Sequence, residues 1–292
     1  MKKIPCNALV FLMVGANPIL AMDADKIPAN RTTAGDDGGI EDAYFNRDEW
    51  SLTANLIWAS RYVPDGFSVG GNHPAWQPDI KIGTPIPGVT LMLRSSIQAE
   101  RAQKASDEYD FILIYSRDFC EDSPFAVTVD TGYHLFVFPN SSITEDRYGN
   151  AISSHDLLGQ KIWAGFSLPE LFPLGDAFLV TSYRYSYWIP FDGELFEPGG
   201  MHTLRLDYSH GVPIFIPGTK LQSVFIGGTM NYHDGFFGVE PGWSHATMNA
   251  GAAADITDGL SASISFNYQW SFTESVNPED VFWYTASITC EF

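Results

Sequence analysis

The sequence predicts an all-β protein, an antiparallel transmembrane β-barrel of about twelve strands (roughly 10 to 14). Three observations predict this fold. Apolar and polar residues alternate over long runs, aromatic residues reach 14% of the chain, and charged residues fall to 17%. Alternation indicates a strand with two different faces. Runs of about 9 to 11 residues match the length that a tilted strand needs to cross a bilayer.

The alternation is clearest near the C-terminal end. One face of that run carries Phe282, Tyr284, Ala286, Ile288, Cys290 and Phe292, and mostly Thr and Ser stand between them. Turn-forming residues between such runs predict twelve strands. The expected ranges are 49–61, 74–83, 88–98, 108–118, 124–138, 159–168, 176–188, 201–210, 220–230, 244–254, 259–270 and 280–292.

The connections between these runs differ in length. Those after even-numbered runs are mostly short, such as 84–87 and 255–258, and those after odd-numbered runs are mostly longer, such as 62–73 and 139–158. Short turns at one end and long loops at the other are typical of bacterial outer-membrane barrels. We therefore expect the short turns on the periplasmic side.

The first residues indicate export rather than structure. Residues 1–21 combine Lys2 and Lys3 with the apolar run 8–16 and a small residue at Ala21, as in a Sec-type signal peptide. Residues 22–48 are acidic and lack periodicity, which predicts a flexible tail or a segment tucked into the pore. Residues 49–292 are then the barrel, and the expected location is the bacterial outer membrane.

Charged residues inside the runs predict the lining of a pore. A charge that faces lipid at mid-bilayer costs about 2 to 4 kcal/mol, so charges within strands are expected to face the lumen. The predicted pore-lining residues are Arg61, Lys81, Arg94, Lys161, Arg184, Arg205, Asp79, Asp110, Asp130 and Asp207. Basic residues in a lumen favour small anionic or polar solutes. The alternative is that Arg–Asp pairs brace the wall of a narrow lumen.

The net charge of −19 excludes nucleic acid as a partner, because phosphates require a basic surface. No cofactor or metal site is expected, since the seven histidines lack metal-ligand spacing. Ser209-His210 and Ser244-His245 place Ser beside His. Neighbours in a strand point to opposite faces, so we expect neither pair to form a Ser–His hydrogen bond. A disulfide between Cys120 and Cys290 is not expected, because their strands lie four apart around the ring.

Two resemblances add to this interpretation. The alternation that ends in Phe292 resembles the C-terminal signal of bacterial outer-membrane barrels. This resemblance implies that Tyr284 and Phe292 are read by the barrel-assembly machinery, and that the bilayer and lipopolysaccharide are the surroundings. The stretch 52–63, with Gly66-Phe67 and the run 73–78, resembles the opening of the TorF-type porin family, although Asp65-Gly66 stands where that family has Arg-Gly.

The sequence therefore predicts a non-enzymatic, porin-like channel for passive diffusion of small polar or anionic solutes. The first alternative is a plugged barrel that acts as an adhesin or structural anchor through its long loops, with 22–48 or 139–158 as the plug. The second is a lipid hydrolase of the outer membrane, which requires a Ser within hydrogen-bonding reach of a His on the outer wall.

Overall fold

The computed structural model describes residues 50–69, 71–100, 107–120, 125–139, 157–168, 177–191, 197–212, 216–219, 221–236 and 239–292. The predicted signal peptide and acidic tail lie outside these residues, as does most of the 139–158 connection. Those three predictions therefore stay untested.

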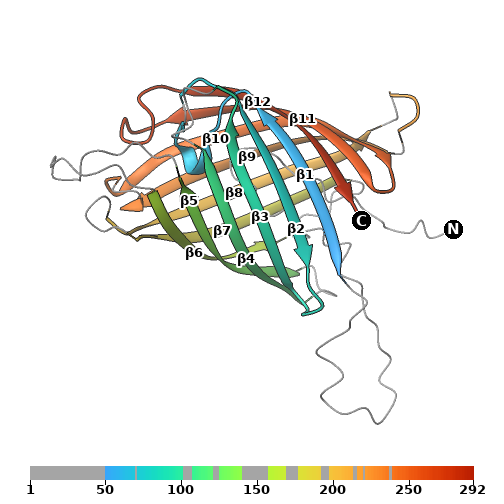
Figure 1. Ribbon diagram of the computed structural model, residues 1–292, viewed down its shortest axis with the longest axis horizontal. Coiled ribbons are helices and arrows are strands. Elements are labelled where there is room, and N and C mark those ends of the chain that lie inside the picture. The colour runs from blue at the N-terminus through green and yellow to red at the C-terminus, as the bar shows by residue number, and fades with distance from the viewer. Residues whose placement is uncertain are drawn as a thin grey trace, which may run out of the picture.

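The described strands form one closed barrel in which each strand pairs antiparallel with its neighbours in the chain, and β1 pairs with β12 (Figure 1). This confirms the predicted fold and the predicted number of strands. Most boundaries agree with the predicted ranges to within a few residues. The strands are β1 (Ser51–Ala59), β2 (Ala75–Gly83), β3 (Val89–Gln98), β4 (Glu108–Phe119), β5 (Val127–Phe138), β6 (Leu157–Leu168), β7 (Ala177–Pro190), β8 (Gly199–Val212), β9 (Leu221–Asp234), β10 (Gly242–Thr257), β11 (Leu260–Ser271) and β12 (Val281–Glu291).

The closure between the first and last strands leaves no free sheet edge. Ala54 pairs with Cys290, and the backbone N–H of Phe292 donates to the carbonyl of Leu52 at 2.9 Å. Closing the sheet pairs the backbone groups that an edge strand would expose. Only such closed sheets, or helices, satisfy the backbone inside a hydrocarbon layer.

The wall of the barrel has an apolar outside and a polar inside. Along β12, Phe282 and Tyr284 are 55% and 41% exposed, whereas Trp283 and Thr285 between them are 2% and 4% exposed. The same alternation exposes Leu113 on β4 and Phe266 on β11. Large apolar side chains thus cover the outside around the ring, and this surface fits a bilayer rather than water.

This assignment predicts the cost of placing a charge on the outer wall. Phe266 lies near the middle of β11. Replacing it by arginine (Phe266→Arg) should destabilise the folded barrel in lipid by about 2 to 4 kcal/mol. Phe282→Arg lies on the same face at the strand end, where the cost should be about 0 to 1 kcal/mol. Urea-dependent folding into phosphatidylcholine vesicles measures both. Equal costs would contradict the bilayer position assigned to this wall.

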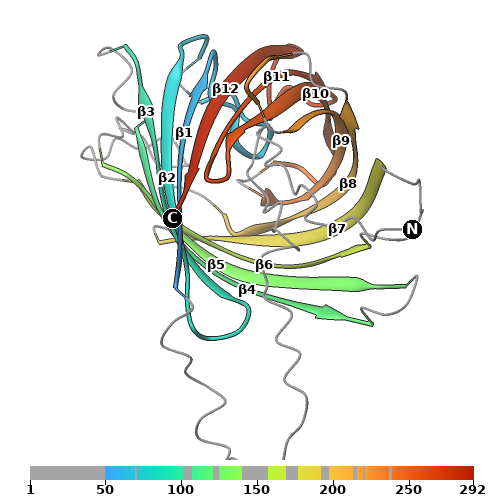
Figure 2. The same cartoon turned by 90° about the vertical axis from the view of Figure 1, so that its right-hand side faces the viewer.

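Figure 2 shows β8 to β12 curving around the interior. The inner face divides into two walls by the residues that it carries. On β11, β12 and β1 it carries mostly uncharged residues, and Ser263–Ser287 and Ser265–Thr285 each pair at 2.7 Å across neighbouring strands. On β2 to β8 it carries most of the strand charges discussed below. On both walls, polar side chains contact partners on the adjacent strand, as Ser263 does Ser287 and Arg94 does Asp110.

The connections after odd-numbered strands lie at one end of the barrel, here called the long-loop end, and those after even-numbered strands lie at the other, the short-turn end. Asp258 and Gly259 alone join β10 to β11, whereas residues 60–74 join β1 to β2. The latter connection contains a short helix, η1 (Pro64–Gly66), coloured blue in Figure 1. Among the described residues, no helix is long and apolar enough to span a membrane. Cys120 and Cys290 are both free, as expected.

Candidate functional site

Nine of the ten predicted lumen residues occupy inward positions on the strands. They are Lys81, Arg94, Lys161, Arg184, Arg205, Asp79, Asp110, Asp130 and Asp207, and each is buried or half-buried. Arg61 differs, because β1 ends at Ala59, so Arg61 follows the strand rather than belonging to it. The strand positions therefore bring the charges together on β2 to β8, as the alternation predicts.

Four of the lumenal cations contact carboxylates. Arg94 donates to Asp110 at 2.6 Å, Arg184 donates to Asp130 at 2.8 Å, and Arg205 donates to Asp207. Lys161 donates at 2.8 Å to Asp65, which comes from the β1–β2 connection. A cation in contact with a carboxylate contributes little net field, so the geometry matches the alternative of wall-bracing pairs more closely than a ring of unopposed cations.

Asp130 lies at the centre of one such brace. It accepts from the indole N–H of Trp163 at 2.9 Å as well as from Arg184, and the Arg184 guanidinium lies 5.3 Å from the Trp163 ring centre. Gly132 lies beneath this indole, where a Cβ would overlap the ring. The three side chains thus hold one another against the wall midway along β5 to β7.

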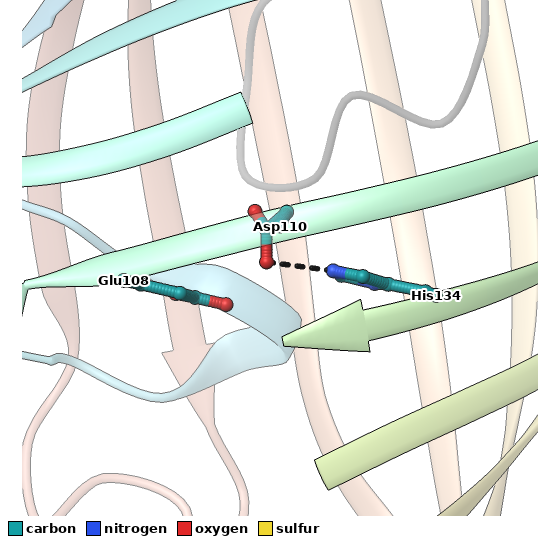
Figure 3. A group of neighbouring side chains, drawn as sticks. All are labelled: Glu108, Asp110 and His134. Atoms are coloured by element: carbon teal, nitrogen blue, oxygen red, sulfur yellow. Dashed lines mark hydrogen bonds and ion pairs between the residues drawn. The ribbon is translucent and has the colours of Figure 1, made fainter. Parts of the chain in front are cut away.

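Three buried side chains, Glu108, Asp110 and His134, converge at the long-loop end (Figure 3). Each offers one ligand atom, and these atoms lie within 4.8 Å of one another, a set that could hold a metal ion. In this structure both Asp110 oxygens already accept hydrogen bonds, from Arg94 at 2.6 Å and from His134 Nε2 at 2.7 Å. The group is thus a satisfied buried network. Glu108 was not among the predicted lumenal residues, although its spacing from Asp110 puts both side chains on one face of β4.

The Tyr62 hydroxyl donates to Glu108 and ties this network to the β1–β2 connection. Tyr62 lies beyond the end of β1 and is 5% exposed. Burial, with the neighbouring Glu108 carboxylate, raises the pKa of the Tyr62 phenol well above its ordinary value. The phenol therefore keeps its proton at neutral pH and remains a donor.

Residues 62–69, here called the inward segment, form a closed turn inside the barrel, because the N–H of Val69 donates to the carbonyl of Tyr62 at 2.9 Å. The Gly66 carbonyl accepts from Gln269 Nε2 at 2.7 Å and from the Asn277 amide. Gly66 has a φ of +90°, and a Cβ there would overlap the His245 ring, so only glycine fits this position.

Apolar contacts hold the inward segment at both of its ends. Val63 belongs to a buried cluster with Val281 and Trp283 of β12. Phe67 packs against a second buried cluster inside the barrel, which consists of Phe136, Trp188, Met201 and Phe236. Since β12 lies far around the ring from β5 and β7, which carry Phe136 and Trp188, the segment crosses the interior. The sequence contains no pattern that places this connection inside rather than outside.

One expectation about chemistry is wrong. Ser244 Oγ and His245 Nδ1 lie 3.0 Å apart, although adjacent strand residues should face opposite ways. The register of β10 against β9 shifts between Trp243 and His245, and this irregularity turns both side chains inward. Ser209-His210 lies on β8 in regular register with β9.

The Ser244–His245 pair is nevertheless arranged as a brace. The Asn231 amide donates to His245 Nε2 at 2.9 Å, which places the ring proton on Nδ1, so His245 donates to Ser244. Ser244 in turn donates to the Asn231 carbonyl at 3.1 Å. A histidine that donates to serine cannot accept the serine proton. The two residues are 0% and 3% exposed and face the interior, not the outer wall that a lipid hydrolase requires.

No protein-family model and no curated protein sequence matches the chain. Several solved structures have a similar fold. One is a KdgM porin, which is 10% identical in sequence, with a TM-score of 0.46; the match covers 82% of this chain and 99% of that chain. LpxR from Salmonella typhimurium has 9% identity, covers 82% and 100%, and scores 0.49. The COG4313 outer membrane channel from Pseudomonas putida F1 has 11% identity, covers 88% and 100%, and scores 0.47. The barrel architecture of this chain is established by its own strand pairing.

Proposed function

We propose that the protein is an outer-membrane channel through which small polar solutes diffuse passively. The observation that carries this proposal is the contrast between the two faces of one closed wall. Large apolar residues cover the outside, whereas the inside carries Ser, Thr, Asn and ion pairs together with the buried cluster of Phe136, Trp188, Met201 and Phe236. A barrel that only anchored loops in the membrane would gain more stability from an apolar core than from a polar one.

The pairing of the lumenal charges narrows the solute class. A lumen of unopposed Arg and Lys would favour anions. Here Asp110, Asp130 and Asp207 contact Arg94, Arg184 and Arg205 in turn. These strand-to-strand pairs therefore favour a weak overall charge preference, and Lys161 differs from them because its carboxylate partner Asp65 comes from the β1–β2 connection. The resemblance to the TorF-type family is consistent with this proposal and stays a prediction.

The proposed location follows from the same wall. A closed barrel with an apolar belt fits the bacterial outer membrane, and the lipid bilayer is the partner of its outer face. Contacts with lipopolysaccharide, recognition of Tyr284 and Phe292 by the assembly machinery, and Sec export stay predictions.

Planar-bilayer recording of the refolded protein tests the channel. We expect discrete current steps and a reversal potential near zero in a salt gradient. Arg184→Gln leaves Asp130 without its cation, so the reversal potential should shift toward cation preference. Arg117→Gln, on the exposed face of β4, is the matched control and should leave selectivity unchanged. Folded protein without current steps under any applied voltage would contradict the channel.

The inward segment favours one second candidate, a barrel closed from within that acts through its long loops. Residues 62–69 cross the interior and contact β4, β6, β11 and β12. The plug segments expected from the sequence, 22–48 and most of 139–158, lie outside the described residues and stay untested. Absence of current in the wild type and in variants that release this segment would favour the closed barrel.

A further inference from the structure

We infer that the wall around the inward segment is a binding site for a small acidic–aromatic solute, and that Asp65, Gly66 and Phe67 occupy this site in cis. This inference deepens the proposed function, because the site lies on the path of the solute. Its ligand class is a compound that joins a carboxylate to an aromatic ring through an amide. Four features of the wall carry the inference.

The first feature is a cation placed for a carboxylate. Lys161 projects inward from β6 and donates to Asp65 at 2.8 Å, and both side chains are 12% exposed. The other described lumenal ion pairs join residues of the strands themselves, such as Arg184 with Asp130. Lys161 instead takes its partner from the connection between β1 and β2. When the segment withdraws, Lys161 would be a lumenal cation without this carboxylate.

The second feature is a pair of amide donors that meet at one oxygen. Gln269 Nε2 of β11 donates to the Gly66 carbonyl at 2.7 Å, and the amide of Asn277 donates to the same oxygen. Asn277 Oδ1 also accepts from the N–H of Ser68 at 3.0 Å. Gln269 and Asn277 are 0% and 5% exposed, so they donate these hydrogen bonds to a peptide carbonyl in a site shielded from water. A bound amide would receive the same hydrogen bonds.

The third feature is an aromatic pocket. Phe67 packs against Phe136, Trp188 and Phe236, and its ring centre lies 5.8 Å from that of His233. Aromatic side chains that surround the Phe67 ring supply a large apolar contact area and favour particular ring orientations. The pocket would accept the aromatic group of a solute in the place of the Phe67 side chain.

The fourth feature is hydrogen-bonding capacity that the segment leaves unused. His233 is 0% exposed, and both of its ring nitrogens are buried without a hydrogen-bond partner among the described residues. Gln269 Oε1 is likewise buried without such a partner. Buried polar groups in proteins are normally satisfied. These atoms lie beside Phe67 and Gly66, so the wall offers more polar groups than residues 65–67 employ.

Competition between segment and solute sets the expected size of the effect. A tethered segment that leaves the site free for about a tenth of the time lowers the apparent affinity for a competitor about tenfold. Asp65→Ala combined with Phe67→Ala removes the side chains that hold the segment in place. This double variant should therefore bind the solute about tenfold more tightly than the wild type.

The probe is the peptide N-acetyl-Asp-Gly-Phe-amide, titrated by calorimetry against detergent-folded protein, with heat-modifiable gel mobility as the folding control. We expect binding to the double variant, and loss of binding when Asp is replaced by Asn, or Phe by Ala, in the peptide. Lys161→Met on the same background should abolish binding. Lys81→Met, a lumenal lysine on β2 near the short-turn end, is the matched control and should retain it.

Folded double variant that does not bind the peptide, or that binds all three peptides equally, would overturn the inference. Binding that survives Lys161→Met would do the same. The titration requires no ion flow, so failure of the site and failure of the channel are separable. A variant that conducts without binding leaves the channel intact, and one that binds without conducting leaves the site intact in a closed barrel.

Discussion

Replacing Asp65 and Phe67 together by alanine is expected to raise the single-channel conductance severalfold. The inward segment crosses the interior at the long-loop end, and the Asp65–Lys161 pair and the Phe67 contacts hold it there. Removing both side chains weakens the hold on two opposite sides of the segment. A wider constriction passes more current, because the narrowest part of a pore sets most of its resistance.

Single-channel recording in planar bilayers measures this effect. Glu100→Gln is the matched control, because Glu100 pairs with His73 at 2.9 Å on the exposed side of the connections, and the side chains are 54% and 34% exposed. It removes one acidic charge without touching the inward segment. Unchanged conductance in the double variant would show that the inward segment does not limit the flow of ions.

Arg94→Met is expected to destabilise the folded barrel by about 3 to 5 kcal/mol, the cost of leaving one partner of a buried ion pair uncompensated. The side chains of Arg94 and Asp110 are 8% and 0% exposed, so water cannot replace the lost partner. His134 still contacts that carboxylate at 2.7 Å, but a neighbouring imidazole does not replace the guanidinium. The Asp110 carboxylate would then be buried near Glu108 without the Arg94 guanidinium that compensates its charge.

Urea-dependent unfolding, followed by gel mobility, measures this loss. Arg117→Met on the exposed face of the same strand, β4, should cost no more than about 0.5 kcal/mol. Combining Arg94→Met with Asp110→Leu should recover much of the stability, because an apolar pair replaces the uncompensated carboxylate. A double variant as unstable as the single one would indicate that packing rather than charge holds this part of the wall.

The amino-acid sequence by itself determined the architecture. A two-residue period depends only on which side chains are apolar, and a strand in a barrel presents alternate residues to lipid and lumen. The alternation along 280–292 therefore predicted the outward Phe282 and the inward Thr285 correctly. The same logic placed Asp130 and Arg184 on the inner face. Strand ends were less certain, and Arg61 fell beyond the end of β1, because turns also depend on what the chain packs against.

Only the tertiary structure decided how these residues meet. The contact of Arg184 with Asp130 depends on the register between neighbouring strands, and a one-residue slip would turn each strand over. The bulge on β10 turned Ser244 and His245 to one side, contrary to the regular period. The path of residues 62–69 into the barrel depends on contacts with β4, β6, β11 and β12 together. Such contacts join residues far apart in the chain, so no local pattern encodes them.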